Sequence, residues 1–228
     1  LAYSLYSFGH YLIVGRAEDL RLYKELSAPV TVPDNSSDRP LAYGTPQIFI
    51  GNTGRGDIVV AASNPNPRAT ARFSYHFDVN GQSFGASSDF ILPGETKYLM
   101  ALGQSLPAAA SAALVIDGYT LERLDAHEIS DWNAYRTARL DFPIQDAVFV
   151  PGASSGLSEK ISVGEVSFKI SNRTAYGYRS VRLIMILKSG GVVIGVNDYR
   201  LENFRSGETR SPRLTWTGAA PLGSEIEI

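Results

Sequence analysis

The feature that most limits the possible folds of this chain is an internal repeat of two short motifs. In each half, a strand-like segment ends in a Ser-Asn dipeptide, and a Gly-Glu-Thr tripeptide follows later. The copies stand at Ser63-Asn64 and Gly94-Glu95-Thr96 and again at Ser171-Asn172 and Gly207-Glu208-Thr209. They lie roughly 110 residues apart, the size of one β-sandwich domain and well above the about 20–50 residues of a solenoid repeat. The repeat therefore predicts two consecutive domains with one plan.

Alternating side chains between these motifs predict β-strands. From Ala71 to Val79 every second residue is apolar, and the residues between are polar or charged, which is typical of a strand with one buried face. Asn80-Gly81 follows directly and predicts a tight hairpin turn, because both residue types accept positive φ angles. Residues 181–187 in the second half are apolar on both faces and lead to Gly190-Gly191. We expect residues 181–187 to form a central strand or one that meets a second surface.

These patterns predict an all-β chain of two tandem immunoglobulin-like β-sandwich domains, preceded by an N-terminal helix. The prolines and the polar turn-forming residues that follow the helix predict an extended linker. The expected boundaries are a helix at 1–26, a Pro-rich linker at 27–45, a first sandwich at 46–134 and a second sandwich at 135–228.

The corners of the two halves carry a family resemblance. Ser63-Asn64-Pro65-Asn66-Pro67 and Leu92-Pro93-Gly94-Glu95-Thr96 have their counterparts in Ser171-Asn172-Arg173-Thr174 and Ser206-Gly207-Glu208-Thr209. With the glycine-turn hairpins between them, they resemble bacterial FxLYD-type domains and the related water-stress (late-embryogenesis-abundant-like) immunoglobulin-like domains, as two copies over residues 45–228. Residues 184–188 lack the usual aromatic and aspartate of the name-giving motif. The resemblance implies an immunoglobulin-like fold in a membrane-anchored protein of the bacterial envelope, and it implies no catalytic residues.

Residues 1–15 carry no charge apart from a possible one on a histidine, and they are rich in aromatic and aliphatic side chains. As a helix they would span about 22 Å, less than the roughly 30 Å of a bilayer core. We expect the end of a transmembrane or signal-anchor helix whose first half precedes Leu1. The membrane-proximal residues would be an aromatic belt and the charge that marks the exit into water, namely Tyr3, Tyr6, Phe8, Tyr11 and Arg16. The alternative is an amphipathic helix that packs on protein, because Ser, Gly and His interrupt the apolar run.

Composition and spacing argue against several kinds of chemistry. The net charge is −2 with mixed signs, so the chain has no basic footprint for nucleic acid. It contains no cysteine, which excludes disulfides and thiolate chemistry. Three scattered histidines give no metal-ligand spacing, so we expect neither metal nor cofactor. Gly152-Ala153-Ser154-Ser155-Gly156 matches a nucleophile elbow, but the last histidine, His127, precedes it. We therefore expect no catalytic residues and no enzymatic activity.

The expected function is that of a membrane-anchored structural protein of the cell envelope, with extracellular domains that act in assembly, adhesion or protein–protein interaction. Such contacts would use surface complementarity or strand addition at a sheet edge, with protein partners or self-association. The candidate interaction residues are Ile184 and Ile186 on the two-faced segment and Trp132 at the seam, whereas Trp216 alternates with Leu214 and is expected in the core. One alternative is an accessory module that binds a ligand such as a glycan in a cleft with exposed Tyr or Trp. Another is a subunit of a larger membrane complex or filament, packed through the N-terminal helix.

Overall fold

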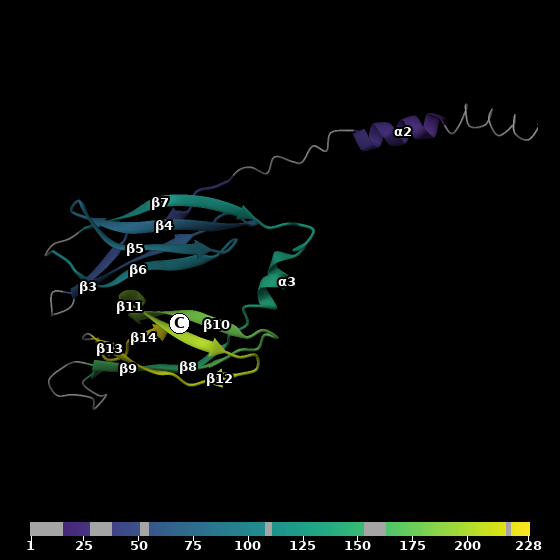
Figure 1. The fold of residues 1–228 in the computed structure, drawn as a ribbon. Helices are drawn as coiled ribbons and strands as arrows, with labels where there is room; N and C mark the ends of the chain where they lie inside the picture. The colour runs from purple at the N-terminus through teal and green to yellow at the C-terminus, as the bar shows by residue number, and fades with distance from the viewer. Residues whose placement is uncertain (1–15, 28–37, 51–54, 108–110, 153–162, 218–219) are drawn as a thin grey trace, which may run out of the picture. The chain divides into compact units, whose positions relative to one another are not determined.

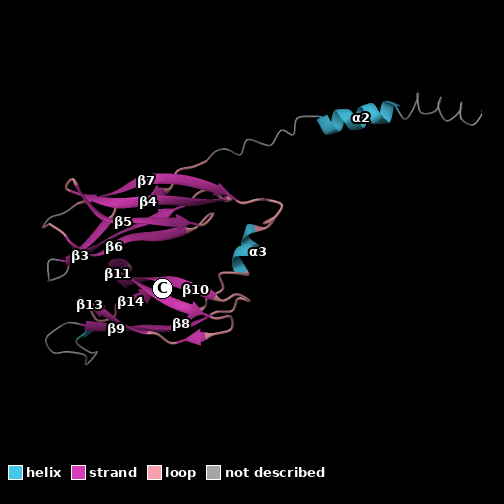
Figure 2. Ribbon diagram, in the orientation of Figure 1, coloured by secondary structure: helices cyan, strands magenta, loops and turns pink. Residues whose placement is uncertain are grey.

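The structure is a computed structural model that describes residues 16–27, 38–50, 55–107, 111–152, 163–217 and 220–228 (Figure 1). The chain divides into two compact units, Leu1–Asp38 and Arg39–Ile228. The described part of the first unit contains the helix α2 (Arg16–Ser27). Strands make up most of the second unit (Figure 2), which confirms the all-β prediction.

Two facing sheets form what we call the first sandwich. The central strand of one sheet, β3, is paired by β1 and β2 along one edge and by β6 along the other; the central strand of the second sheet, β4, lies between β5 and β7. All of these pairs are antiparallel. The strands are β1 (Ala42–Tyr43), β2 (Gln47–Ile50), β3 (Arg55–Ser63), β4 (Ala69–Val79), β5 (Gln82–Ile91), β6 (Thr96–Ser105) and β7 (Ala112–Arg123).

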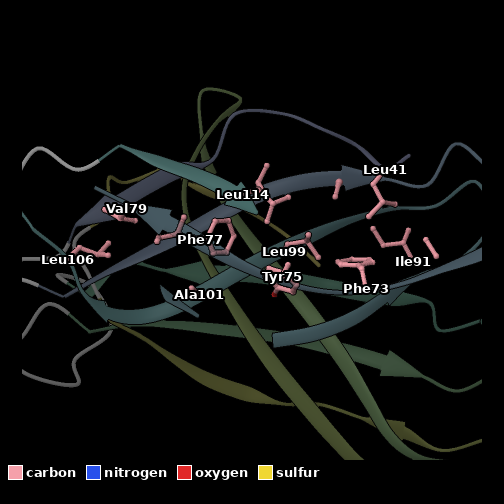
Figure 3. Packing of buried hydrophobic residues seen from close by; sticks show 14 residues of the cluster. Leu41, Phe73, Tyr75, Phe77, Val79, Ile91, Leu99, Ala101, Leu106 and Leu114 are labelled. Atoms are coloured by element: carbon pink, nitrogen blue, oxygen red, sulfur yellow. The ribbon is translucent and has the colours of Figure 1, made fainter. Parts of the chain in front are cut away.

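The core of the first sandwich lies between its two sheets, as Figure 3 shows. The alternation of β4 is confirmed, because Phe73, Tyr75 and Phe77 are all buried. The rings of Tyr75 and Phe77 meet edge to face with centroids 5.8 Å apart, a favoured aromatic geometry. The predicted hairpin is also present, since Asn80 and Gly81 have φ angles of 54° and 81°.

A second pair of facing sheets follows the short helix α3 (Trp132–Thr137), and we call it the second sandwich. In one of its sheets β9 is paired by β8 along one edge and by β12 and β13 along the other; in the second sheet β10 lies between β11 and β14. The strands are β8 (Ile144–Val150), β9 (Val163–Ser171), β10 (Tyr178–Ser189), β11 (Val192–Phe204), β12 (Thr209–Arg210), β13 (Arg213–Thr217) and β14 (Glu225–Glu227).

Trp216 belongs to the core of the second sandwich, as expected from its alternation with Leu214. It is 6% exposed and meets Phe149 edge to face at 6.2 Å. Gly195 lies directly against it, because a Cβ at that position would come within 3.0 Å of the indole ring. Because Gly195 has no side chain, the large ring of Trp216 can pack directly against the backbone of β11.

The repeated motifs form equivalent corners. The buried Asn64 donates from its side-chain amide to the carbonyl oxygens of Ala69 (2.7 Å) and Ile91 (3.0 Å), and its own amide oxygen accepts from the backbone N–H of Asn66 (3.0 Å). It thereby ties together three segments that leave the sheets. Asx side chains suit such corners because they can replace backbone groups as hydrogen-bond partners.

Asn172 repeats this arrangement in the second sandwich. Its side-chain amide donates to the carbonyl oxygens of Tyr176 (2.8 Å) and Arg205 (3.0 Å), and its amide oxygen accepts from the N–H of Thr174 (3.0 Å). The serine before each asparagine shares a hydrogen bond with the threonine of the Gly-Glu-Thr motif, at 2.7 Å in the first sandwich and 2.8 Å in the second. The structure confirms the interpretation of these motifs as structural corners.

A third apolar cluster covers the outer face of β10. Ile186 and Val196 pack with Val59 and Met100, which lie on the outer face of the sheet of β3 and β6. The segment that is apolar on both faces is thus central in its own sheet and meets a second surface, as expected. We call these four residues the joining cluster.

Candidate interaction surface

The outer face of the sheet β5-β4-β7 carries the polar half of the alternating pattern. Arg72, Ser74 and His76 project from β4 on the side opposite to the buried aromatics. In register with Ser74 lie Ser88 on β5 and Gly118 on β7. Three small residues therefore stand side by side across three strands.

These small residues produce a shallow hollow of about 430 Å³ on the outer face. The hydroxyls of Ser74 and Ser88 lie 3.0 Å apart and share a hydrogen bond. At Gly118 a Cβ would meet no atom within 4 Å, so the space above the strand is open. The lining includes hydroxyl groups together with aromatic rings, since Phe90 and Tyr119 also border it.

Phe90, Arg72 and Thr120 form the next row of the face and close one end of the hollow. Phe90 is 43% exposed. The Arg72 guanidinium lies 5.7 Å from its ring centroid and the Lys97 ammonium 4.8 Å from it, within the range of cation–π attraction. Arg72 also forms an ion pair with Glu122 at 2.7 Å, which contributes little to stability because both side chains are more than half exposed.

A chain of charges runs from the rim of the hollow to the second sandwich. Asp89 is 10% exposed and pairs with Lys97 at 2.5 Å. Its second oxygen lies 3.6 Å from Arg182 on β10, and Arg182 in turn pairs with Asp198 at 2.7 Å. The two sandwiches are therefore connected by the ion pair between Asp89 and Arg182 as well as by the joining cluster.

The row beyond Ser74 contains a His–Asp pair. The Nδ1 atom of His76 lies 2.7 Å from a carboxylate oxygen of Asp117. A bulge in β7 allows this contact, because the register shifts by one residue between the partners of Ser74 and Tyr75 and leaves Asp117 unpaired in the ladder. The outer face thus combines an imidazole and a guanidinium with several carboxylates and hydroxyls.

Two of the three predicted interaction residues lie at the joining cluster. Ile186 is 2% exposed within it, and Ile184 packs against it half-buried. Val59 and Met100 of the same chain occupy the surface that these isoleucines face. Contact of Ile184 or Ile186 with a separate partner remains a prediction.

Trp132, the third predicted interaction residue, begins α3 and is half-buried. Its indole N–H donates to the carbonyl oxygen of Pro93 at 3.2 Å, and its ring stacks on Tyr135 with centroids 6.0 Å apart. Asp131 caps the helix by accepting a hydrogen bond from the N–H of Ala134 at 3.0 Å. Trp132 therefore contacts the corner of the first sandwich that carries Gly94, and it borders a second hollow of about 440 Å³. Binding of a partner by Trp132 remains a prediction.

The membrane-proximal residues Tyr3, Tyr6, Phe8 and Tyr11 lie outside the described residues. Arg16 is described and is the exposed first residue of α2. No helix in the described part of the chain has the length and apolar character that a membrane span requires. The predicted anchor therefore remains a prediction.

Within the described ranges, no three His, Cys, Asp or Glu side chains come together in a way that could hold a metal ion. Of the segment that matches a nucleophile elbow, only Gly152 is described. A scan against protein-family models finds no family that matches the chain, and a search of curated proteins finds no relative.

Sequence reasoning missed the hollow on the outer face. Its floor depends on Ser74, Ser88 and Gly118 standing in one row, and these residues are far apart in the sequence. Their alignment follows from the register of β4 with β5 and β7, including the bulge in β7. The available signals were the serines of β5 and the central glycine of β7, two strands that lie on opposite sides of β4. These signals become specific only once the register is known.

Proposed function

We propose that the chain is a non-enzymatic, membrane-anchored protein of the cell envelope. It presents two tandem immunoglobulin-like sandwiches outside the cytoplasm for assembly, adhesion or protein–protein interaction. The shared corners support this proposal, since they are the features in which the chain resembles FxLYD-type and water-stress domains. The membrane anchor would be the apolar segment before Arg16.

The observation that most supports an interaction role is the joining cluster. Ile186 and Val196 bury their side chains against Val59 and Met100, so the two sandwiches share apolar surface. The ion pair of Arg182 with Asp89 adds a polar connection. Two sandwiches that are already held in one arrangement lose less conformational entropy when they bind a partner. Such an arrangement suits a protein that acts through surface complementarity.

Fractionation of native cells, followed by protease treatment of intact cells, tests this role. The proposal predicts that the protein sediments with membranes and that protease added outside removes both sandwiches. Chemical crosslinking on intact cells should then capture a protein partner or a second copy. A protein that stays soluble and protected inside cells would overturn the proposal and favour an N-terminal helix that packs within an internal assembly.

The hollow on the outer face favours a second candidate function, glycan binding. Hydroxyls of Ser74, Ser88 and Thr120 lie beside the exposed ring of Phe90, and sugars are commonly held by hydroxyl hydrogen bonds and by contact with aromatic rings. Saturable binding to a member of a glycan panel, lost in Phe90→Ala, is the expected result.

Tyr43→Ala is the matched control for the glycan test, because Tyr43 is a 48% exposed aromatic on β1, away from the hollow. It should leave binding unchanged. Equal loss in both variants, or no binding to any glycan, would rule out the hollow as a glycan site.

A further inference from the structure

The hollow on the outer face has a positively charged group at one end. Arg72 and Asp89 are the charged residues of its described lining. Arg72 projects outward, whereas Asp89 lies opposite the buried Phe73, so its side chain belongs to the other face of the sheet. There Lys97 and Arg182 lie within ion-pair distance of its carboxylate. The charge that faces the hollow is therefore that of Arg72.

The guanidinium of Arg72 has donors left for a ligand. Its ion pair with Glu122 is made through Nε. The two terminal nitrogens make no hydrogen bond within the described part of the chain. They form the end of a planar fork that matches the two oxygens of a carboxylate. The ion pair and the ring of Phe90, 5.7 Å from the guanidinium carbon, restrain this fork, which lowers the entropic cost of binding.

A pair of hydroxyls stands in the next row of the same face. The hydrogen bond between Ser74 and Ser88 uses one of their two hydroxyl hydrogens, so the other can be donated to a ligand. Ser74 follows Arg72 by two residues, which is about 6.8 Å along a strand. That separation is comparable to the length of one sugar ring with its substituents.

Gly118 provides the space that a sugar ring needs above the hydroxyl pair. It lies opposite Ser74 on β7, and a Cβ at this position would meet no atom within 4 Å. The ring of Phe90 is 43% exposed and borders the same space, where it offers an apolar contact for the C–H groups of a sugar. The hollow thus has a cation at one end, hydroxyls in its floor and an aromatic ring at its side.

We propose that the hollow binds an acidic glycan through one uronic acid unit. The carboxylate of this unit binds Arg72, and its ring hydroxyls bind Ser74 and Ser88. In a hexuronic acid the carboxylate and two of the ring hydroxyls lie at opposite ends of the ring, which matches the order of the two rows. This inference rests on the glycan-binding candidate and adds the class of sugar. It does not depend on where the protein is located in the cell.

Calorimetric titration of the full chain with uronic acid oligosaccharides tests the assignment. The probes are linear trisaccharides of galacturonate, glucuronate and mannuronate. Each is compared with its methyl ester, which keeps the hydroxyls and lacks the charge. Triglutamate supplies carboxylates without sugar hydroxyls. The same titrations are repeated on variants of the hollow.

Two variants change the hollow and a third is the matched control. Arg72→Gln removes the fork. Gly118→Ile fills the space above the serines, and the fold should tolerate it because Gly118 has open surroundings and no left-handed φ angle. The control is Arg213→Gln, since Arg213 is a 79% exposed arginine that also pairs with a glutamate, in the second sandwich.

The proposal predicts that at least one uronate trisaccharide binds at least about tenfold more tightly than its ester, and that Arg72→Gln removes this difference. Gly118→Ile should abolish binding, whereas Arg213→Gln should leave it unchanged. Triglutamate should bind no more tightly than the esters. The affinity for the uronate should fall as salt is added, because the charges are exposed.

Three results would overturn the proposal in different ways. Equal binding of uronates and esters, lost only in Gly118→Ile, would exclude the uronic acid assignment and keep the glycan candidate. No binding of any saccharide would exclude both. Uronate binding that survives Arg72→Gln and Gly118→Ile, or that triglutamate equals, would show that the carboxylate is held elsewhere or without the serine hydroxyls.

Discussion

Single side chains hold the corners of both sandwiches together, and Asn172 shows how. Its amide is 1% exposed, donates to backbone carbonyl oxygens and accepts from the N–H and hydroxyl of Thr174. Buried polar groups that lose their partners cost about 1–3 kcal/mol each. The corner therefore depends on one residue type, because an aspartate would place oxygen next to the carbonyl oxygens that now accept hydrogen bonds.

Asn172→Ala should lower the free energy of unfolding by about 3 kcal/mol, since several backbone groups would be left buried without partners. Urea denaturation of the variant and the parent chain measures the change. Asn133→Ala is the control, because Asn133 is exposed on α3, and its effect should stay within about 0.5 kcal/mol. Equal stability of Asn172→Ala and the parent would contradict the role of the buried amide.

Gly85→Ala should destabilise the first sandwich by about 3 kcal/mol or more, because it combines backbone strain with a clash. The φ angle is 62°, and the new Cβ would lie 2.2 Å from the Cβ of Ala101. Gly81→Ala separates the two causes, since Gly81 has a φ angle of 81° but open space around it, and it should cost about 1 kcal/mol. Equal losses in the two variants would show that the contact of β5 with Ala101 is unimportant.

Asp57 links stability to pH. Partial burial raises the pKa of its carboxyl above the ordinary value of 3.8, and the hydrogen bond from the Gly103 N–H at 2.7 Å offsets this only in part. Because the pKa of the folded state exceeds that of the unfolded state, the folded protein binds the proton more tightly. Ionisation of Asp57 therefore reduces stability as the pH rises through the folded-state pKa.

Asp57→Asn should be at least as stable as the parent at neutral pH, because it keeps an oxygen acceptor for Gly103 and removes the buried charge. The advantage should vanish well below pH 3.8, where the carboxyl of the parent is protonated in both the folded and the unfolded state. Urea denaturation at the two pH values measures this difference. If Asp57→Asn changes the free energy of unfolding by the same amount at both pH values, the raised pKa of Asp57 is not the cause of the change.

At the scale of elements, the sequence predicted local features better than contacts between sheets. The alternation of Ala71 to Val79 and the Asn80-Gly81 turn specified a hairpin, because both depend only on neighbouring residues. The Ser-Asn and Gly-Glu-Thr motifs were correctly interpreted as corners. Residues 181–187 indicated a second apolar surface, but the surface that meets it comes from β3 and β6, distant in the sequence. The row of Ser74, Ser88 and Gly118 was missed for the same reason.

Ile186→Ala on β10 should lower the free energy of unfolding by about 2–4 kcal/mol, because Ile186 is 2% exposed although it faces away from the core of its own sandwich. Chemical denaturation of the variant provides the measurement. Val192→Ala, at a 64% exposed position at the start of β11, should change stability by less than about 0.5 kcal/mol. A similarly small effect of Ile186→Ala would mean that the outer face of β10 is solvated in solution.

At the scale of the whole molecule, the residues from Arg39 to Ile228 form one compact unit. Each sandwich has its own core, and the joining cluster adds apolar contact between them. Proteins made of tandem sandwiches can instead move as independent bodies when such surfaces are small and polar. The buried joining cluster and the ion pair of Asp89 with Arg182 favour the coupled arrangement, on which the proposed interaction role depends.

A double-mutant cycle between Val59 and Ile186 tests that coupling most directly. Both residues lie in the joining cluster, whereas Val60, the next residue of β3, lies in the core of the first sandwich. Alanine substitutions at Val59 and Ile186 should interact by at least about 0.5 kcal/mol in the free energy of unfolding, while those at Val60 and Ile186 should add. Additive effects in both cycles would contradict the account, because the sandwiches would then be energetically independent.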